Sequence, residues 1–254
     1  MLGLVGEVFT GIEIAWAVAR GVAKLTKARK KRTALIKEGK VILICSCQHP
    51  RPTHPPGRQV LWRIKGFNQK GNPIWDHATL CESSLITGIH DAFSLAHLGL
   101  FFGSLGIDHE LRTDVWPAIT PVEQSENNLF LIGSPASNAV SEKLCPYIPP
   151  AYFKYENDYK EMVIRDKDRH SEKEDGIVIK LPNPFGSEDT KKVALLMAGI
   201  GPDGTEAAAR FVVEKVHKLP RRIRNSAAWI VRVKAEVEKG FIVRIRAWPE
   251  VIFG

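Results

Sequence analysis

The chain of 254 residues is long enough for one α/β domain with a substantial hydrophobic core, and its 44% apolar and 25% charged composition is that of a globular protein. A net charge of +8 indicates an anionic partner: a nucleotide, a nucleic acid or an acidic lipid surface. Four cysteines are too few for a disulfide scaffold in a chain of this size, so we expect reduced thiols and a cytoplasmic protein.

Residues 5–36 predict one long helix, about 45 Å at 1.5 Å per residue. A narrow stripe of this helix is charged and the opposite arc is apolar, and the run KLTKARKKR at residues 24–32 adds basic residues toward its C-terminal end. Three roles are open for the segment 1–37: packing on its own domain or on a second copy in a homo-oligomer, lying on an acidic membrane surface through residues 5–32, or spanning the bilayer. Glu13 and Arg20 make spanning costly, and the basic flank places any membrane contact on the inner, cytoplasmic face.

Metal-binding residue types occur together once, in Cys45-x-Cys47-x-His49 followed by His54. The spacing matches none of the usual zinc patterns, and Cys45 lies inside the apolar run VILICSC, which predicts a strand. Alternation along a strand puts Cys45 and Cys47 on the same face, where packing is the simpler role. We therefore predict no metal site, and no motif identifies a cofactor.

The segment 41–254 predicts an α/β domain in which a strand, a turn of small residues and a helix occur together three times. The turns centre on Gly88, Gly133 and Gly199. In a parallel sheet such turns gather at the carboxyl ends of the strands, where open α/β folds bind ligands. We therefore expect one composite pocket built from the three turns.

The third turn has the most informative pattern, Gly199-x-Gly201-x-x-Gly204, between an apolar run and a helix. Glycines in this position let the backbone turn tightly and approach a ligand, and free N–H groups of the helix N-terminus face an anion. A dinucleotide site also requires an acidic residue about 20 residues farther on, where this chain has the basic stretch from Pro220 to Arg224. The pattern thus indicates a phosphate-bearing ligand and argues against a conventional NAD-dependent dehydrogenase.

Candidate site residues come from the turns and from Pro182-Asn183-Pro184, which closes the predicted strand Gly176 to Leu181. The candidate ligand-binding residues are Thr87, Gly88, Gly133, Ser134, Ser137, Asn138, Asn183, Gly199, Gly201, Gly204 and Thr205. The candidate catalytic residues are His90, Asp91 and Glu206. His90 is best suited as a general acid or base because a histidine pKa lies near neutrality. A purely structural role is also open for several of them: Ser137 suits a helix N-cap, Asn183 suits a turn, and Asp203 with Glu206 has capping-box spacing.

Residues 228–248 alternate between apolar and polar around a Lys239-Gly240 turn, which predicts a half-exposed antiparallel hairpin. The residues expected to face the core are Val231, Val233, Val237, Val243 and Ile245. The opposite face carries Arg232, Lys234, Arg244 and Arg246. This basic face makes nucleic-acid binding a candidate function, although Trp248 is the one aromatic residue among the basic ones that could stack on a single strand.

The LIGSPASN turn, the GIVIKLPNPF strand and the LLMAGIGPDGTEAA unit occur in this order within residues 80–215. Together they resemble an uncharacterised prokaryotic domain family with the pattern strand-Gly-Gly-Pro-x-x-Asn, then Asn-Pro, then Ala-Gly followed by Gly-Thr. Ser134 replaces the second glycine of that pattern, which makes the turn less permissive. The resemblance implies a Rossmann-like fold without an established activity, and it does not extend to the N-terminal helix or the C-terminal hairpin.

These observations predict a three-layer, Rossmann-like α/β domain with a mostly parallel sheet, an N-terminal amphipathic helix and a C-terminal antiparallel hairpin. The leading functional hypothesis is a sensory or regulatory protein that binds a nucleotide-like or other phosphate-bearing ligand in the turns. Its long helix would mediate membrane association or assembly. The alternatives are a hydrolase or glycosidase acting on a nucleotide in the same pocket, and a nucleic-acid binder, which is less favoured.

Overall fold

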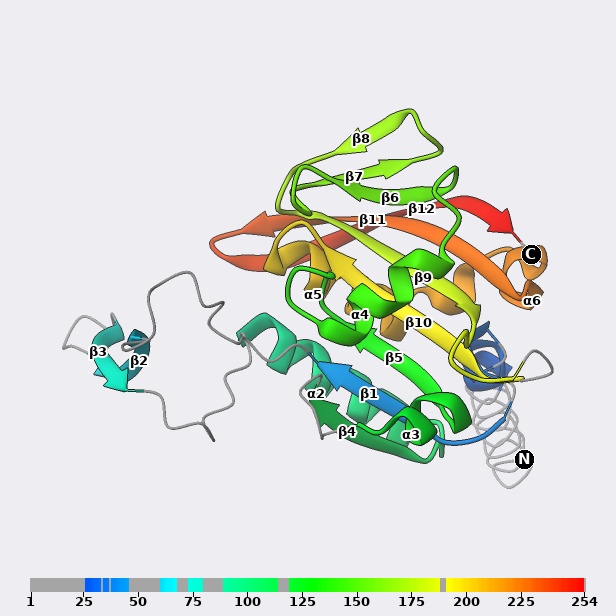
Figure 1. Ribbon diagram of the computed structural model, residues 1–254, viewed down its shortest axis with the longest axis horizontal. Coiled ribbons are helices and arrows are strands. Elements are labelled where there is room, and N and C mark those ends of the chain that lie inside the picture. Colours follow the sequence, from blue (N-terminus) through cyan, green and yellow to red (C-terminus); the bar gives the residue numbers. More distant parts are fainter. Residues whose placement is uncertain are drawn as a thin grey trace, which may run out of the picture.

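The computed structural model describes residues 26–32, 34–36, 38–45, 60–67, 73–79, 89–113, 119–187 and 191–253 (Figure 1). The strands of these residues form three sheets, of seven, three and two strands. The two-stranded sheet is the antiparallel pair β2 (Val60–Phe67) and β3 (Pro73–Thr79). The predicted α/β class is confirmed for the described part of the chain.

The central sheet has the strand order β12-β11-β9-β10-β5-β1-β4 (Figure 1). Its strands are β1 (Val41–Cys45), β4 (His109–Thr113), β5 (Asn128–Ile132), β9 (Asp175–Pro182), β10 (Val193–Gly199), β11 (Ala228–Glu238) and β12 (Phe241–Phe253). Strands β4, β1, β5 and β10 are mutually parallel, whereas β10–β9, β9–β11 and β11–β12 are antiparallel pairs. The sheet is therefore mixed, with one parallel half and one antiparallel half.

The direction of β9 follows from the short connection after it. Only residues 183–192 join β9 to β10, and the two strands pair along their whole length, from Pro182 opposite Val193 to Gly176 opposite Gly199. A parallel crossover needs a dozen or more residues, usually with a helix, so this connection can only return the chain antiparallel. Consequently β9 ends at the edge of the sheet where the mutually parallel strands β4, β1, β5 and β10 begin.

Each face of the central sheet is covered by other elements. On one face α2 (Ile89–Ser104), α5 (Pro202–Glu214) and residues 34–36 pack on Leu43, Phe130 and Leu195. The other face is covered by two short helices, α3 (Pro121–Glu126) and α4 (Ala139–Leu144), and by the three-stranded sheet. The strands of that sheet are β6 (Phe153–Glu156), β7 (Glu161–Ile164) and β8 (Asp168–His170). Val140, Phe153 and Met162 pack in the core on this side. Burial on both faces explains why β1 and β5 are nearly all apolar.

The end of the predicted N-terminal helix belongs to the domain core. Residues 26–32 and 34–35 are helical, and Ala34, Leu35 and Ile36 are buried with α2 and α5. Lys31 donates to the Val213 carbonyl and lies 4.8 Å from the centre of the Phe101 ring. Residues 5–25 of the predicted helix lie outside the described residues. Within the described residues, no helix has the length and apolar character needed to cross a membrane.

The C-terminal hairpin is present, with a turn at Lys239 and Gly240, and it extends to residue 253. Its alternation is interrupted: Glu236 pairs with Arg244 but Val237 pairs with Ile242. Val243 is the extra residue of this β-bulge, and 52% of its surface is exposed, so its predicted core position is wrong. Ile242 and Ile245 are buried instead, on either side of the bulge.

Short elements follow α4 and α5 in the chain. The 3-10 helices are η1 (Cys145–Tyr147) and η2 (Val216–Lys218), and α6 (Arg221–Asn225) leads into β11. Prolines at residues 146 and 220 mark the starts of η1 and α6, consistent with the preference of proline for the first positions of a helix. Because α6 precedes β11, its basic residues lie at the edge of the sheet where β11 begins.

Candidate functional site

Two of the three predicted turns are neighbours at the carboxyl ends of the parallel strands. The turn after β5 begins at Gly133, whose N–H donates to the Met197 carbonyl of β10 at 2.9 Å. The turn after β10 begins at Gly199. Of the third turn, Thr87 and Gly88 lie outside the described residues, and His90 and Asp91 lie in the first turn of α2.

Asn138 is fully buried and its side chain makes four hydrogen bonds within the fold. Its amide nitrogen donates to the carbonyls of Ile44 (3.3 Å) and Ile132 (3.0 Å), near the carboxyl ends of β1 and β5. Its amide oxygen accepts from the N–H groups of Val140 (3.0 Å) and Ser141 (3.1 Å) as the N-cap of α4. The helix N-cap is therefore Asn138 rather than Ser137. These four bonds use the donors and acceptor that Asn138 would need for a ligand.

Ser134 and Ser137 are half-buried and belong to the same tight turn. The Ser137 hydroxyl donates to the Ser134 carbonyl at 3.2 Å, and the N–H groups of Ser137 and Asn138 also donate to that carbonyl. The turn thus closes on its own backbone.

The glycine-rich turn packs closely against the segment that enters β9. A Cβ on Gly204 would overlap the Asp175 carbonyl, and a Cβ on Gly201 would lie 2.7 Å from the Cβ of Lys173. The Gly204 N–H donates to the Lys173 carbonyl at 3.1 Å, and the Ile200 N–H donates to the Asp175 carbonyl at 3.0 Å. The glycines at these positions therefore allow strand and helix backbones to approach each other, and protein atoms occupy the space expected for a phosphate.

The polar residues at the start of α5 are also engaged with the protein. The N-cap of α5 is Gly201, without a side-chain cap, so Asp203 and Glu206 do not form the capping box that their spacing suggested. Asp203 is buried and lies 3.7 Å from the Lys173 ammonium, where it complements the helix dipole. The Thr205 hydroxyl donates to the Gly201 carbonyl at 3.4 Å, and Glu206 is half-buried.

Asn183 lies at the opposite edge of the sheet from the turns, because β9 is antiparallel. Its buried amide donates to the carbonyls of Gln124 (2.6 Å) and Asn127 (2.9 Å) and accepts from the Phe185 N–H (3.1 Å). It joins the β9–β10 connection to the end of α3. The structure therefore does not bring Asn183 together with Gly133 or Gly199.

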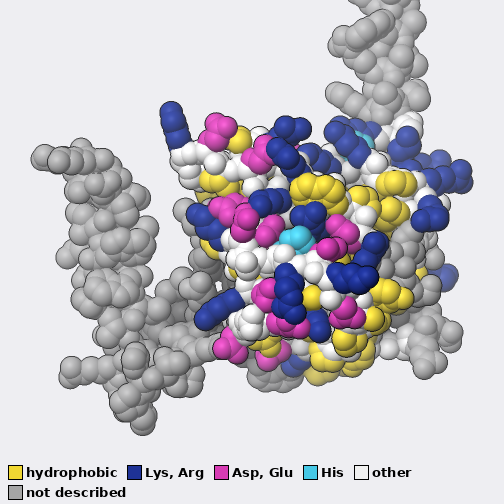
Figure 2. All heavy atoms as spheres, turned by 90° about the horizontal axis from the view of Figure 1, so that it is seen from above, with side chains coloured by type: hydrophobic (Ala, Val, Ile, Leu, Met, Phe, Trp, Pro, Cys, Tyr) yellow, Lys and Arg dark blue, Asp and Glu magenta, His cyan; other side chains and the backbone are white. Residues whose placement is uncertain are grey.

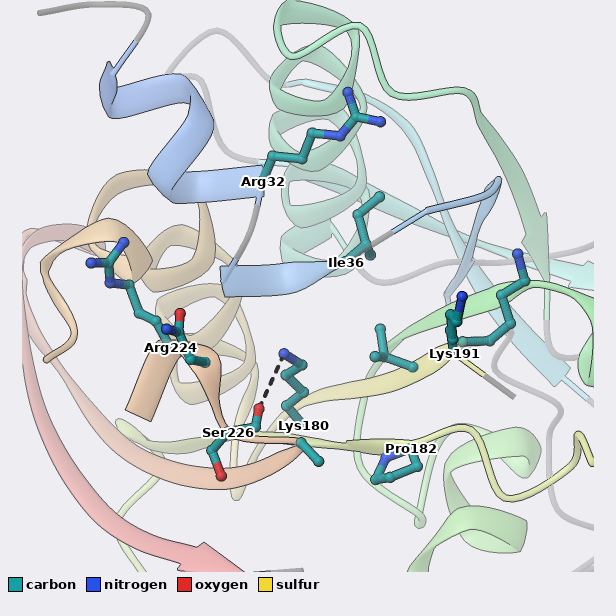
Figure 3. A pocket seen from close by; sticks show the side chains of 11 residues that line it. Arg32, Ile36, Lys180, Pro182, Lys191, Arg224 and Ser226 are labelled. Atoms are coloured by element: carbon teal, nitrogen blue, oxygen red, sulfur yellow. Dashed lines mark hydrogen bonds between the residues drawn. The ribbon is translucent and has the colours of Figure 1, made fainter. Parts of the chain in front are cut away.

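A cavity of about 460 Å³ opens at the same edge as Asn183, where β10 begins and β9 ends (Figure 3). We call it the Lys180 cavity. Its lining residues are Arg32, Ile36, Lys180, Pro182, Lys191, Lys192, Val193, Arg224, Asn225, Ser226 and Ala227. Five of these side chains are basic, and none of the described lining residues is acidic. The size falls within the range of about 300–1,000 Å³ that is usual for small-molecule sites.

Lys180 rises from the sheet toward the middle of the cavity (Figure 3). It is only 6% exposed, and its ammonium donates to the carbonyls of Ala34 (3.1 Å) and Ser226 (3.5 Å). A buried ammonium is stabilised by hydrogen bonds and by a nearby anion. Together with the other basic lining residues, Lys180 makes the cavity electrostatically suited to an anionic group.

The basic rim of the cavity comes from distant parts of the sequence. Lys191 and Lys192 precede β10, Arg32 ends the first described helical segment, and Arg224 lies in α6. In Figure 3 Lys191 and Arg224 stand on opposite sides of Lys180. Lys191 is 4.0 Å from Glu38, and both side chains are well exposed, so this ion pair is weak.

A positive potential extends beyond the cavity toward α6. Burial, followed by the repulsion of four nearby cations, lowers the pKa of the His217 imidazole to about 4; the cations are Lys27, Lys31, Lys218 and Arg224. Figure 2 shows Lys and Arg side chains gathered along the right-hand side of the molecule, where Figure 1 places α6, whereas Asp and Glu side chains lie toward the centre and left.

The basic face of the hairpin is largely neutralised by carboxylates. Arg246 pairs with Glu236, and Lys234 pairs with Glu172 at 2.5 Å. Arg232 lies 3.4 Å from Glu250 and stacks on the Trp248 ring at 4.1 Å. These pairs leave little net positive charge for a phosphate backbone, so the hairpin is less suited to nucleic acid than the sequence suggested.

The cysteines of the described residues have structural surroundings. Cys45 is buried, and its thiol donates to the Arg112 carbonyl at 3.6 Å. Burial raises the pKa of the Cys145 thiol to about 12, which makes it a poor nucleophile. Among the described residues no three His, Cys, Asp or Glu side chains are grouped to hold a metal ion, and Cys47, His49 and His54 lie outside them.

No family model, curated protein or solved structure matches this chain.

Sequence reasoning missed the Lys180 cavity because its lining residues, from Arg32 to Ala227, are separated by up to 195 positions. One signal was available: a lysine within the apolar run GIVIKLP, on the same face of β9 as the buried Val178. A second was the pair Lys191-Lys192 immediately before a buried strand.

Proposed function

We propose that the protein binds a phosphate-bearing small molecule in the Lys180 cavity. The observation that carries the proposal is the buried Lys180 ammonium in a cavity whose other charged lining residues, among those that the structure describes, are all basic. A phosphate offers several strong acceptor oxygens, and charge-assisted hydrogen bonds to them are about twice as strong as neutral ones. In addition, the cavity has open space for a ligand, whereas protein atoms fill the space beside the glycine-rich turn.

A regulatory role is part of the proposal. Arg32 of the cavity wall is the last of the helical residues 26–32, and Ile36 directly follows the helical residues 34–35. The Ala34 carbonyl accepts from Lys180. A ligand that engages Lys180 acts on the same ammonium that holds this segment in place. This shared contact supports coupling between ligand and N-terminal helix, through which we propose membrane association or assembly.

The Rossmann-like classification is likewise a proposal. It is supported by the parallel strands β4, β1, β5 and β10 and by the position of α2 and α5 on one face of the sheet. The cavity, however, lies where these strands begin, whereas such folds usually bind ligands at the carboxyl ends.

The test is calorimetric titration with inorganic phosphate at low salt. Lys180→Met should weaken phosphate binding at least about tenfold, because a hydrogen bond to a charged group contributes about 1.5–3 kcal/mol and 1.4 kcal/mol is a factor of ten. Lys167→Met removes the same charge from the exposed β7–β8 turn and should leave the affinity unchanged.

A second measurement does not depend on a variant. Phosphate added to the labelled wild-type protein should shift the backbone amide NMR signals of Ile36, Val193 and Ser226. Shifts centred on residues 199–205 would place the ligand in the turns and overturn the proposal, as would a wild-type protein that does not bind phosphate.

A further inference from the structure

The two outermost strands of the central sheet, β4 and β12, differ in how open they are to a further strand. β4 has five residues, and ion pairs of Lys40 with Glu110 and of Arg112 with Glu123 flank it. Short, charged edge strands are protected against pairing with another chain. β12 has 13 residues, and among the strands that the structure describes it pairs with β11 alone (Figure 1). The sheet edge that is open to a partner is therefore β12.

The hydrogen bonds of β11 show which backbone groups of β12 point outward. The Ala235 N–H donates to the Glu174 carbonyl at 3.0 Å, on the side of β11 where β9 begins. In an antiparallel ladder the backbone groups of successive residues point alternately to the two sides of a strand. Ala235 therefore directs none toward β12, and the N–H and C=O of Ile245, which lies opposite it, point away from β11. By the same alternation, the backbone groups of Ala247 and Pro249 also point outward.

Ala247 is the middle one of these three outward-facing residues, which lie between register shifts at positions 243 and 250. Two copies of β12 that run antiparallel about a two-fold axis at Ala247 bring Ile245 opposite Pro249 of the second copy. The two Ala247 residues then exchange both of their hydrogen bonds, and each Ile245 N–H donates to a Pro249 carbonyl. Pro249 has no N–H for the Ile245 carbonyl, but that carbonyl already accepts from the Lys215 ammonium. Every outward-facing backbone group of the three residues thus has a partner.

The side chains of β12 match in the same register. Arg246 comes opposite Trp248 of the second copy, and a guanidinium is attracted to the face of an indole ring. The Trp248 ring is already oriented within its own chain, because Arg232 stacks on it at 4.1 Å. Arg244 comes opposite Glu250 of the second copy, which is a pair of opposite charges. Farther out, the sequence is symmetric about Ala247, since FIV at 241–243 is mirrored by VIF at 251–253.

We infer that two copies of this chain associate through β12, paired antiparallel about Ala247, so that their central sheets join into one. The contact is isologous, and it uses the open edge of both copies. Because β4 is short and charged, the joined sheet ends there on both sides and the assembly closes as a dimer. The contact involves neither the Lys180 cavity nor residues 1–25, so it does not depend on the proposed function.

The test measures the mass of the full-length protein by sedimentation velocity at increasing concentration. The wild-type protein should approach twice the mass of one chain. Ala247→Pro removes one N–H from each copy and should raise the dissociation constant at least about tenfold, the effect of two lost hydrogen bonds. Ala247→Val adds the same number of side-chain carbons but keeps the N–H, so this control should remain dimeric. Removing residues 1–25 should also leave the dimer intact.

Amide hydrogen exchange with residue resolution gives a second readout on the wild-type protein, and it stays decisive if Ala247→Pro does not fold. Dilution below the dissociation constant should speed exchange at Ile245 and Ala247 and leave Arg246 and Trp248, whose N–H groups face β11, unchanged. A wild-type protein that is monomeric at millimolar concentration would overturn the inference. So would a dimer that Ala247→Pro does not weaken, or exchange at Ile245 and Ala247 that does not respond to dilution. A dimer lost on removal of residues 1–25 alone would place the contact in the N-terminal segment and overturn it as well.

Discussion

Gly204 is the residue whose sequence pattern and structural role differ most. It belongs to a motif typical of phosphate-binding turns, yet its missing side chain makes room for the Asp175 carbonyl. The contact is between backbone atoms of α5 and β9, neither of which can rotate away. A glycine in this turn is therefore required by packing whether or not a ligand is present.

Gly204→Ala should accordingly lower the free energy of unfolding by about 1–3 kcal/mol, the usual cost of overpacking. Gly103→Ala is the matched control, since Gly103 is exposed in α2 and its Cβ would meet only the His109 ring at 4.0 Å. There the gain in helix propensity should stabilise the protein by up to about 1 kcal/mol. Urea unfolding of both variants checks the expected opposite signs; stabilisation by both would show that α5 and β9 are not in close contact.

Asn138 joins three elements through one carboxamide, so its removal leaves four buried backbone groups without their partner. Asn138→Ala should lower the free energy of unfolding by about 2–4 kcal/mol, combining the loss of a helix cap with unsatisfied buried groups. Ser137→Ala, which removes one local hydrogen bond in the same turn, should cost about 1 kcal/mol or less. Equal losses in the two variants, measured by urea unfolding, would contradict the structural role of Asn138.

Among the secondary-structure elements, the C-terminal hairpin shows how one residue changes which side chains are buried. The alternating pattern correctly predicts two strands and their turn, but the bulge at Val243 shifts the pattern in β12. Arg210 of α5 donates to the Ile242 carbonyl at 2.7 Å, next to the bulge. The irregularity therefore lies where α5 contacts the hairpin.

The bulge predicts the relative cost of two truncations in β12. Ile245→Ala should lower the free energy of unfolding by about 2–5 kcal/mol because Ile245 is 2% exposed. Val243→Ala should change it by about 0.5 kcal/mol, as for an ordinary surface substitution. Thermal or urea unfolding gives both values. A Val243→Ala variant as unstable as Ile245→Ala would contradict the bulge and show that Val243 is buried, as the uninterrupted alternation predicts.

At the scale of the whole molecule, the end of the predicted N-terminal helix belongs to the domain core, which its helical pattern does not indicate. Ala34, Leu35 and Ile36 complete the core on the α2–α5 face, and Arg32 and Ile36 wall the Lys180 cavity. The domain therefore begins before β1, and the proposed ligand site includes the end of the segment expected to be separate.

A pair of truncations tests this division. Removing residues 1–25 should preserve the described contacts and the unfolding transition. Removing residues 1–36 should cost about 3–6 kcal/mol, since burying a Leu or Ile side chain contributes about 1.5–3 kcal/mol. It should also abolish phosphate binding, because the cavity loses a wall. If the protein lacking residues 1–36 unfolds at the same urea concentration as the one lacking 1–25, residues 34–36 are not part of the core.

Much of the fold can be predicted from local sequence. The apolar runs at Val41 to Cys45, Asn128 to Ile132 and Val193 to Gly199 are buried strands, as the apolar pattern predicts. A helix, α5, follows the third of them and begins at Pro202, within the glycine-rich pattern. These features depend on hydrophobicity, periodicity and turn residues within about ten positions, so the sequence alone determines them.

Only the tertiary structure decided the direction of β9, the role of each polar turn residue and the position of the candidate site. Asn138 and Asn183 could equally have bound a ligand; their partners are backbone carbonyls supplied by other strands and helices. Likewise, Lys180, Lys191 and Arg224 line one cavity because the end of β9, the start of β10 and α6 lie at one edge of the sheet. Hydrogen-bond partners and cavities arise from contacts between distant segments, and no local pattern encodes them.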